Sequence, residues 1–139
     1  MSRRRLVVAL AAVLALLAAA SAHGAIFVLL STTTVHRGGV LRVTGDAPRM
    51  PLYALPARLY PCAQTATCSS PLHRSAAPGR PFVLLGHTRG GSSTGASRIR
   101  LPKALRPGRY KVFVWCAQCG GSLIIAGRDA SGQTLHVTR

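Results

Sequence analysis

Residues 105–125 read Leu-Arg-Pro-Gly-Arg-Tyr-Lys-Val-Phe-Val-Trp-Cys-Ala-Gln-Cys-Gly-Gly-Ser-Leu-Ile-Ile. The stretch opens on a Pro-Gly pair, which is typical of a turn, and continues with β-branched and aromatic residues, which favour strands. Cys116 and Cys119 then flank a tight reversal, and a second apolar run begins at Leu123. The stretch therefore predicts a β-hairpin whose turn is fixed by cysteine chemistry.

The strand expected at Arg109–Cys116 has two different faces, because side chains alternate along a strand. We expect one face to point into the core, and it consists of Tyr110, Val112, Val114 and Cys116. The opposite face carries Lys111, Phe113 and Trp115. Phe113 and Trp115 either pack under a neighbouring loop, which is the commoner arrangement for large aromatic side chains, or form an outward platform for a ligand.

Short strand-like segments separated by turn signals make up the rest of the chain, and no helical periodicity follows the N-terminal region. Besides 109–116, we expect strands at Ala25–Ser31, Val40–Thr44, Leu52–Tyr60, Pro81–Thr88, Ser97–Leu101, Ser122–Ala126 and Thr134–Val137. Pro56 makes its segment either an edge strand or two short pieces. Cys62–Gly79 is expected to be an irregular connection. Seven to eight short strands predict an all-β protein, an immunoglobulin-like Greek-key β-sandwich.

One local motif strengthens the sandwich prediction. The spacing of Leu105, Pro107, Gly108 and Tyr110 resembles the tyrosine corner at the start of strand F in fibronectin-III-like sandwiches. In that corner the tyrosine hydroxyl bonds to backbone a few residues upstream and fixes the turn.

The N-terminus has the layout of a secretory signal. Three arginines at 3–5 precede an apolar run at 6–20, and Ala-Ser-Ala at 20–22 suits cleavage. We expect a hydrophobic signal helix over 1–22 and a single domain over 23–139. The alternative is an uncleaved membrane anchor, because about 20 apolar residues can cross a bilayer. In either case the arginines keep the N-terminus in the cytoplasm, so the domain lies outside.

The charge is strongly one-sided, with 18 Lys+Arg against 2 Asp+Glu and a formal net charge of +16. Such a field favours anionic partners. Export argues against nucleic acid as that partner, so anionic envelope polysaccharide or lipid headgroups fit better. The alternative is that the arginine excess reflects the coding bias of a GC-rich genome.

Carboxylates are nearly absent, since Asp46 and Asp129 are the only two acidic residues. Glycoside hydrolysis needs a pair of them at one site, and calcium sites need several oxygen ligands. No catalytic motif stands out, so we expect a non-catalytic protein.

From about Gly38 onward the chain resembles the small exported immunoglobulin-like proteins common in actinobacteria and related bacteria. The resemblance is carried by residues 38–45 (Gly-Gly-Val-Leu-Arg-Val-Thr-Gly), 105–110 (Leu-Arg-Pro-Gly-Arg-Tyr) and 115–124 (Trp-Cys-Ala-Gln-Cys-Gly-Gly-Ser-Leu-Ile). It implies the fold and an extracytoplasmic location, and it implies no activity.

Four cysteines in an exported chain indicate disulfides. Cys62, Cys68, Cys116 and Cys119 allow three connectivities, of which we favour the two local bridges because their sequence spacing is short. Two alternatives are a thiol-redox pair at Cys-x-x-Cys and a zinc site made by both clusters. The redox reading is weakened because the pair follows a strand instead of starting a helix.

His23 would become the first residue of the mature chain after cleavage. Its α-amine and imidazole could then chelate copper(II) together. Ala22-His23-Gly24 is similar to the processing site of lytic polysaccharide monooxygenases and periplasmic copper-resistance proteins. The chain is short for the former and lacks an Asp-x-His pair typical of the latter. Candidates for a second ligand are His36, His73, His87 and His136, although nothing in the sequence brings any one of them to His23.

The sequence thus predicts an exported or surface-associated β-sandwich that serves as a binding or structural module for anionic envelope components. Copper binding through His23 is the first alternative, and a zinc or thiol-redox site at the cysteines is the second. Nothing in the sequence indicates the oligomeric state.

Overall fold

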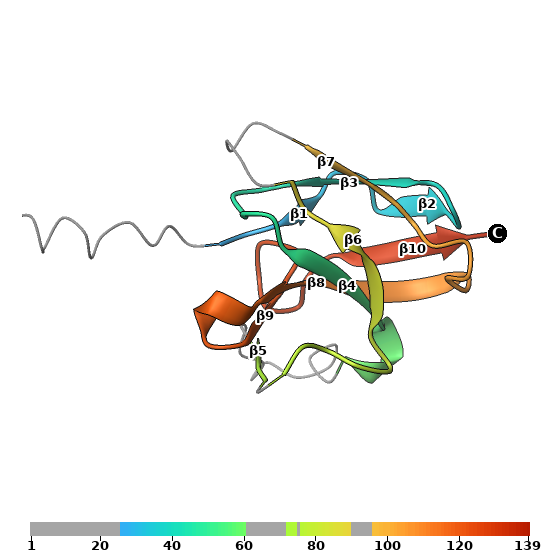
Figure 1. Ribbon diagram of the computed structural model, residues 1–139. Coiled ribbons are helices and arrows are strands. Elements are labelled where there is room, and N and C mark those ends of the chain that lie inside the picture. The colour runs from blue at the N-terminus through green and yellow to red at the C-terminus, as the bar shows by residue number, and fades with distance from the viewer. Residues whose placement is uncertain (1–25, 61–71, 75, 90–95) are drawn as a thin grey trace, which may run out of the picture.

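Two β-sheets form the fold in the computed structural model, which describes residues 26–60, 72–74, 76–89 and 96–139 (Figure 1). The small sheet has the strand order β1 (Leu29–Leu30), β3 (Val40–Thr44), β7 (Ser97–Arg100). The large sheet has the order β2 (Thr34–His36), β10 (Thr134–Thr138), β8 (Gly108–Cys116), β4 (Pro51–Pro56), β6 (Val83–His87). In the same sheet β9 (Ser122–Ile125) pairs with the second half of β8 and with β5 (Leu72–His73). The all-β prediction is confirmed, and the two sheets are consistent with a β-sandwich.

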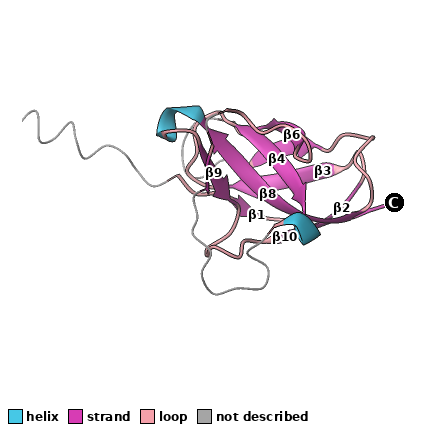
Figure 2. Ribbon diagram, turned by 90° about the horizontal axis from the view of Figure 1, so that it is seen from below, coloured by secondary structure: helices cyan, strands magenta, loops and turns pink. Residues whose placement is uncertain are grey.

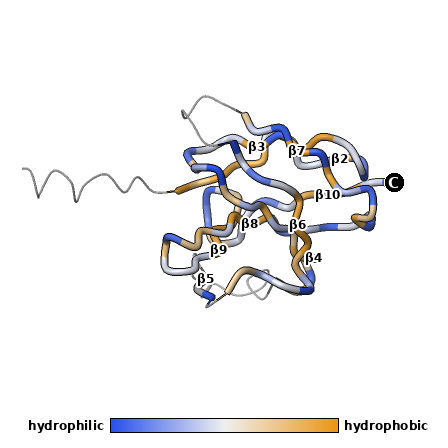
Figure 3. The backbone as a smooth tube through the Cα atoms, viewed as in Figure 1, coloured by the Kyte–Doolittle hydropathy of each residue, from blue (hydrophilic) through white to orange (hydrophobic). Residues whose placement is uncertain are grey.

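Strand alternation builds the main core between the sheets. Leu41 and Val43 of β3 point inward while Arg42 between them is exposed. On β8 the inward set is the predicted one, made by Tyr110, Val112, Val114 and Cys116. Figure 3 shows hydrophobic residues along β4, β6 and β8 and hydrophilic residues at the turns.

A second, smaller core covers the outer face of the large sheet. Its buried members are Leu55, Tyr60, Phe113, Trp115, Leu123 and Ile125, and Phe82 packs against them. The Phe113 ring makes edge contacts with Tyr60 and Phe82 at centroid distances of 5.5 and 5.8 Å. Phe113 and Trp115 are therefore covered by other described residues, Phe113 by Tyr60 and Phe82 among them, which confirms the covered arrangement and leaves no aromatic platform there.

The segment Leu52–Tyr60 is two pieces, as one of the two interpretations predicted. β4 ends at Pro56, and a 3-10 turn, η1 (Ala57–Leu59), follows. The edge-strand interpretation is wrong, because β4 lies between β6 and β8. Pro56 is the last residue of β4 and lies beyond Ala54, where pairing with β6 ends, so it occupies the margin of the sheet, where proline is tolerated.

Three strand expectations need correction. The first strand is only β1, and a further strand, β2, pairs in parallel with β10. The connection expected to be irregular over Cys62–Gly79 contains β5, which pairs with β9. Both missed strands are two or three residues long, too short to show a period of two in the sequence.

The cysteine hairpin forms as predicted. Cys116 and Cys119 are disulfide-bonded with their Cα atoms 5.2 Å apart, across a 3-10 turn, η3 (Ala117–Cys119). Figure 2 shows η1 and η3 at opposite ends of the large sheet. Gly121 has a φ of +74°, and a side chain there would collide with the Arg74 carbonyl oxygen. Cys62 and Cys68 lie outside the described residues.

Candidate anion-binding groove

A groove of about 1060 Å³ opens where η1, the β7–β8 loop and the β9–β10 turn meet at one end of the large sheet. Four cationic side chains line it, and we call them the groove cations: Arg58, Arg106, Arg109 and Lys111. Its volume lies at the upper limit of the range of about 300–1,000 Å³ that is typical of small-molecule sites. The groove is therefore large enough for a multiply charged anion.

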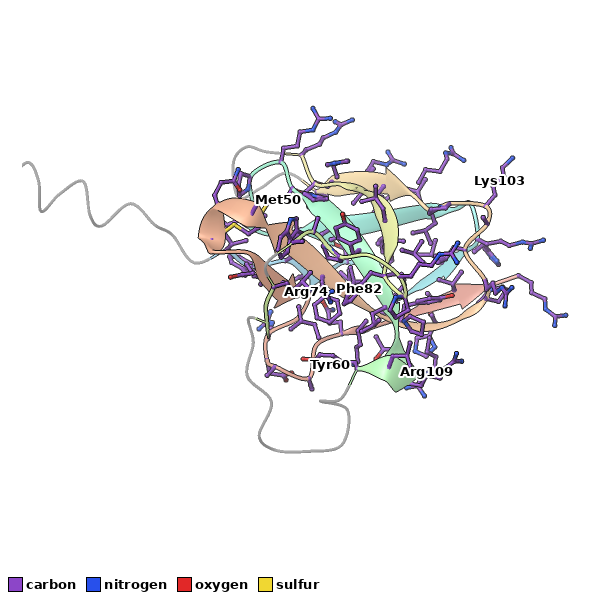
Figure 4. The ribbon with its side chains drawn as sticks, turned by 60° about the horizontal axis from the view of Figure 1, so that its bottom comes forward. Met50, Tyr60, Arg74, Phe82, Lys103 and Arg109 are labelled. Atoms are coloured by element: carbon purple, nitrogen blue, oxygen red, sulfur yellow. A yellow bond between two sulfur atoms is a disulfide. The ribbon has the colours of Figure 1, made fainter. Side chains whose placement is uncertain are left out.

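The groove cations come from separate elements. Arg109 and Lys111 belong to β8, where they alternate with the inward-pointing Tyr110 and Val112, so they lie on the outer face of the large sheet. Arg106 belongs to the β7–β8 loop and Arg58 to η1. Figure 4, turned to bring the underside of the molecule forward, shows Arg109 at the same end of the fold as Lys103.

The predicted corner forms one wall of the groove. Leu105, Pro107, Gly108 and Tyr110 all line it. The Tyr110 hydroxyl donates to the Arg106 carbonyl oxygen at 2.7 Å, a contact of the kind that defines a tyrosine corner. This bond fixes the backbone that carries Arg106, so it positions one of the groove cations.

We predict that Tyr110→Phe lowers the free energy of unfolding by about 1 kcal/mol, because a single hydrogen bond of this kind contributes roughly that much. Urea unfolding followed by tryptophan fluorescence measures the change. The control is Tyr53→Phe, since the Tyr53 hydroxyl bonds to no described residue. Equal losses of unfolding free energy in the two variants would mean that the Tyr110–Arg106 hydrogen bond does not stabilise the fold.

Lys111 is the most buried of the groove cations, with 8% of its surface exposed. Its Nζ donates to the Gly132 carbonyl oxygen and to Thr134 Oγ1, both at 3.0 Å. Burial lowers the pKa of Lys111, nearby Arg109 lowers it further, and Asp129 opposes them. An ammonium has three donors, and the third has no acceptor among the described residues. Lys111 can thus offer one more charged hydrogen bond to an anion in the groove.

Asp129 is the acid nearest this region, and its carboxylate is already engaged. Oδ1 accepts from the Ser131 and Gly132 N–H groups at 3.0 and 3.2 Å, and from the Ser131 hydroxyl. These bonds, the side-chain one first, lower the pKa of Asp129. Within the described part of the chain Asp129 forms no ion pair with Lys111. The net charge of the groove is therefore positive.

The other predicted site residues lie elsewhere. The Cys116–Cys119 disulfide is at the far end of β8 from the groove, and His23 lies outside the described residues. His36 and His136 are on neighbouring strands, and His36 Nδ1 lies 2.7 Å from Thr138 Oγ1. No group of three or more metal-ligating side chains occurs among the described residues.

Sequence reasoning predicted a basic surface but not this cluster. The alternation on β8 could have placed Arg109 and Lys111 on one face. Nothing local links them to Arg58, which is more than 45 residues away in the sequence and reaches the groove only because β4 pairs with β8.

Comparison with known proteins gives no relative, because no protein-family model, curated protein or solved structure matches this chain. No helix in the described ranges is long and apolar enough to span a membrane. The groove is therefore interpreted from its own chemistry.

Proposed function

We propose that this protein is an exported, non-catalytic immunoglobulin-like β-sandwich that binds an anionic component of the cell envelope through the groove. The observation that carries the proposal is that three arginines line the same groove as buried Lys111, whose third donor has no acceptor among the described residues. Arginine and lysine bind phosphate and carboxylate groups through charge-assisted hydrogen bonds, which are stronger than neutral ones.

The strand arrangement supports an immunoglobulin-like Greek key. β3 and β7 share one sheet while β4, β8 and β10 share the other, which matches the division of strands B and E from C, F and G in that fold. The tyrosine corner at the start of β8 agrees with the assignment of β8 as strand F.

Export is supported by the sequence alone. The arginines at 3–5, the apolar run and the Ala-Ser-Ala site are the parts of a secretory signal, with an uncleaved anchor as the other outcome. A domain outside the cytoplasm meets anionic polysaccharides and lipid headgroups, which are the ligands that a basic groove suits.

Binding of trimetaphosphate, a compact anion with three charges, tests the groove by isothermal titration calorimetry. We predict that R106Q/R109Q weakens binding about tenfold, since two charge contacts at a partly exposed site together contribute about 1–2 kcal/mol. Wild-type binding should also weaken with added salt, because salt screens these contacts.

The matched control is R49Q/R128Q, which removes the same charge at two exposed arginines that do not line the groove. If both double variants lose equal affinity, the binding reflects net charge and the groove has no specific role. Wild-type affinity that is unchanged in high salt would contradict an electrostatic site.

A further inference from the structure

Three exposed arginines stand close together on the outer face of the small sheet, and we call them the arginine ladder: Arg42 on β3, and Arg98 and Arg100 on β7. Arg42 lies directly opposite Arg98 in the antiparallel register. Their inward neighbours Leu41, Val43 and Ile99 belong to the main core. Alternation therefore fixes the arginines on the solvent side.

This arrangement opposes the stability of the sheet. Like charges directly opposite each other on neighbouring strands are destabilising. Within the described ranges none of the three arginines forms an ion pair, and Arg100 donates instead to the Gly38 carbonyl oxygen at 3.3 Å. A position that breaks a local rule without compensation is where function is expected.

The arginine ladder and the groove lie on opposite faces of the two-layer fold. Arg42 points away from the core on the small sheet, and Arg109 and Lys111 lie on the outer face of the large sheet. Figure 1 shows β3 and β7 on the other side of the fold from β8 and β10. One anionic group cannot touch both surfaces.

We propose that the arginine ladder is a second contact surface for polyanions, so that one molecule bridges two anionic polymer chains. Bridging needs two contacts. The groove contact rests on the proposed function, whereas the ladder contact is argued from Arg42, Arg98 and Arg100 alone. Guanidinium groups bind phosphate oxygens in a forked geometry, and a two-stranded row of them suits a chain with repeated phosphate groups.

A polymer chain fits the ladder better than a bilayer does. Membrane-surface binding combines charge with apolar side chains that insert below the headgroups. The large exposed hydrophobic side chains of the described residues are Phe27, Leu59, Val83 and Leu84. None of these four belongs to β3 or β7.

The test uses long-chain inorganic polyphosphate and the full mature domain, with light scattering as the readout of bridging. Wild-type protein at a stoichiometric ratio should form large particles. We expect R42Q/R98Q to reduce the scattering about tenfold, because bridging depends on two linked contacts. The same variant should raise the melting temperature, since the opposed charges are removed, and should keep its affinity for trimetaphosphate.

The control R49Q/R128Q has the same net charge and should still form particles. The proposal that the ladder binds polyanions would be overturned if R42Q/R98Q scattered as strongly as wild type. It would also be overturned if the control R49Q/R128Q lost as much scattering as R42Q/R98Q. Tighter wild-type binding to phosphatidylglycerol vesicles than to polyphosphate, lost in R42Q/R98Q, would assign the ladder to a membrane and overturn the polymer proposal. Failure of the groove proposal would be seen in a different experiment, as trimetaphosphate binding that R106Q/R109Q leaves unchanged.

Discussion

Lys111→Met should weaken trimetaphosphate binding by about 10- to 100-fold, because a hydrogen bond to a charged group contributes about 1.5–3 kcal/mol. Methionine is unbranched and only one atom shorter than lysine, so the change removes the charge and the donors with little change in volume. Calorimetric titration at constant ionic strength measures the affinity. A thermal melt of the same sample shows that the variant is folded.

Lys103→Met is the matched control, since Lys103 is the only other lysine of the chain and does not line the groove. It should leave the affinity within about twofold of wild type, as expected for an exposed charge outside the site. Equal losses in the two variants would show that Lys111 acts only through net charge.

The lowered pKa of Lys111 adds a pH signature to the same experiment. An anion binds the charged ammonium, so affinity should be full below the pKa of Lys111 in the free protein and fall as the pH rises through it. Because burial lowers that pKa, the fall should begin below the ordinary lysine value of about 10.4. The charges of trimetaphosphate do not titrate in this range, and Lys111→Met should remove the dependence.

Phe113→Ala should lower the free energy of unfolding by about 3–5 kcal/mol, as for other fully buried aromatic residues. The side chain has no exposed surface and forms the centre of the second core, against Tyr60 and Phe82. Guanidinium unfolding followed by circular dichroism measures the loss. Such a change would remove a large fraction of the roughly 5–15 kcal/mol that stabilises a domain of ordinary stability.

Trypsin cleavage after Arg74 gives a second readout, because the Arg74 guanidinium lies 5.3 Å from the centre of the Phe82 ring. Phe113→Ala should speed this cleavage, because it removes the ring that packs against Phe82 and so loosens the contact between Phe82 and Arg74. Phe113→Leu is the control, and it should lower the free energy of unfolding much less, since leucine keeps most of the apolar volume. A loss below about 1 kcal/mol for the alanine variant would mean that this face is not a core.

Much of the fold was predictable from neighbours in the sequence. Turn residues, β-branched runs and strict alternation predicted β3, β7 and β8 closely, and they gave the correct inward face of β8. They failed for β2 and β5, which are too short to show a period and exist only because β10 and β9 offer them an edge. Pro56 was ambiguous for a related reason, because the position of β4 within the sheet is not a local property.

The sequence by itself determined the all-β class, the cysteine hairpin, the corner around Tyr110 and the excess of positive charge. All of these depend on residue type and on spacings of a few residues. Only the tertiary structure decided that Arg58 joins Lys111 in a groove, that Arg42 faces Arg98 across two strands, and that Phe113 is covered. These contacts join residues tens of positions apart. Strand pairing and layer packing bring such residues together, and the local sequence pattern does not record which distant segments will meet.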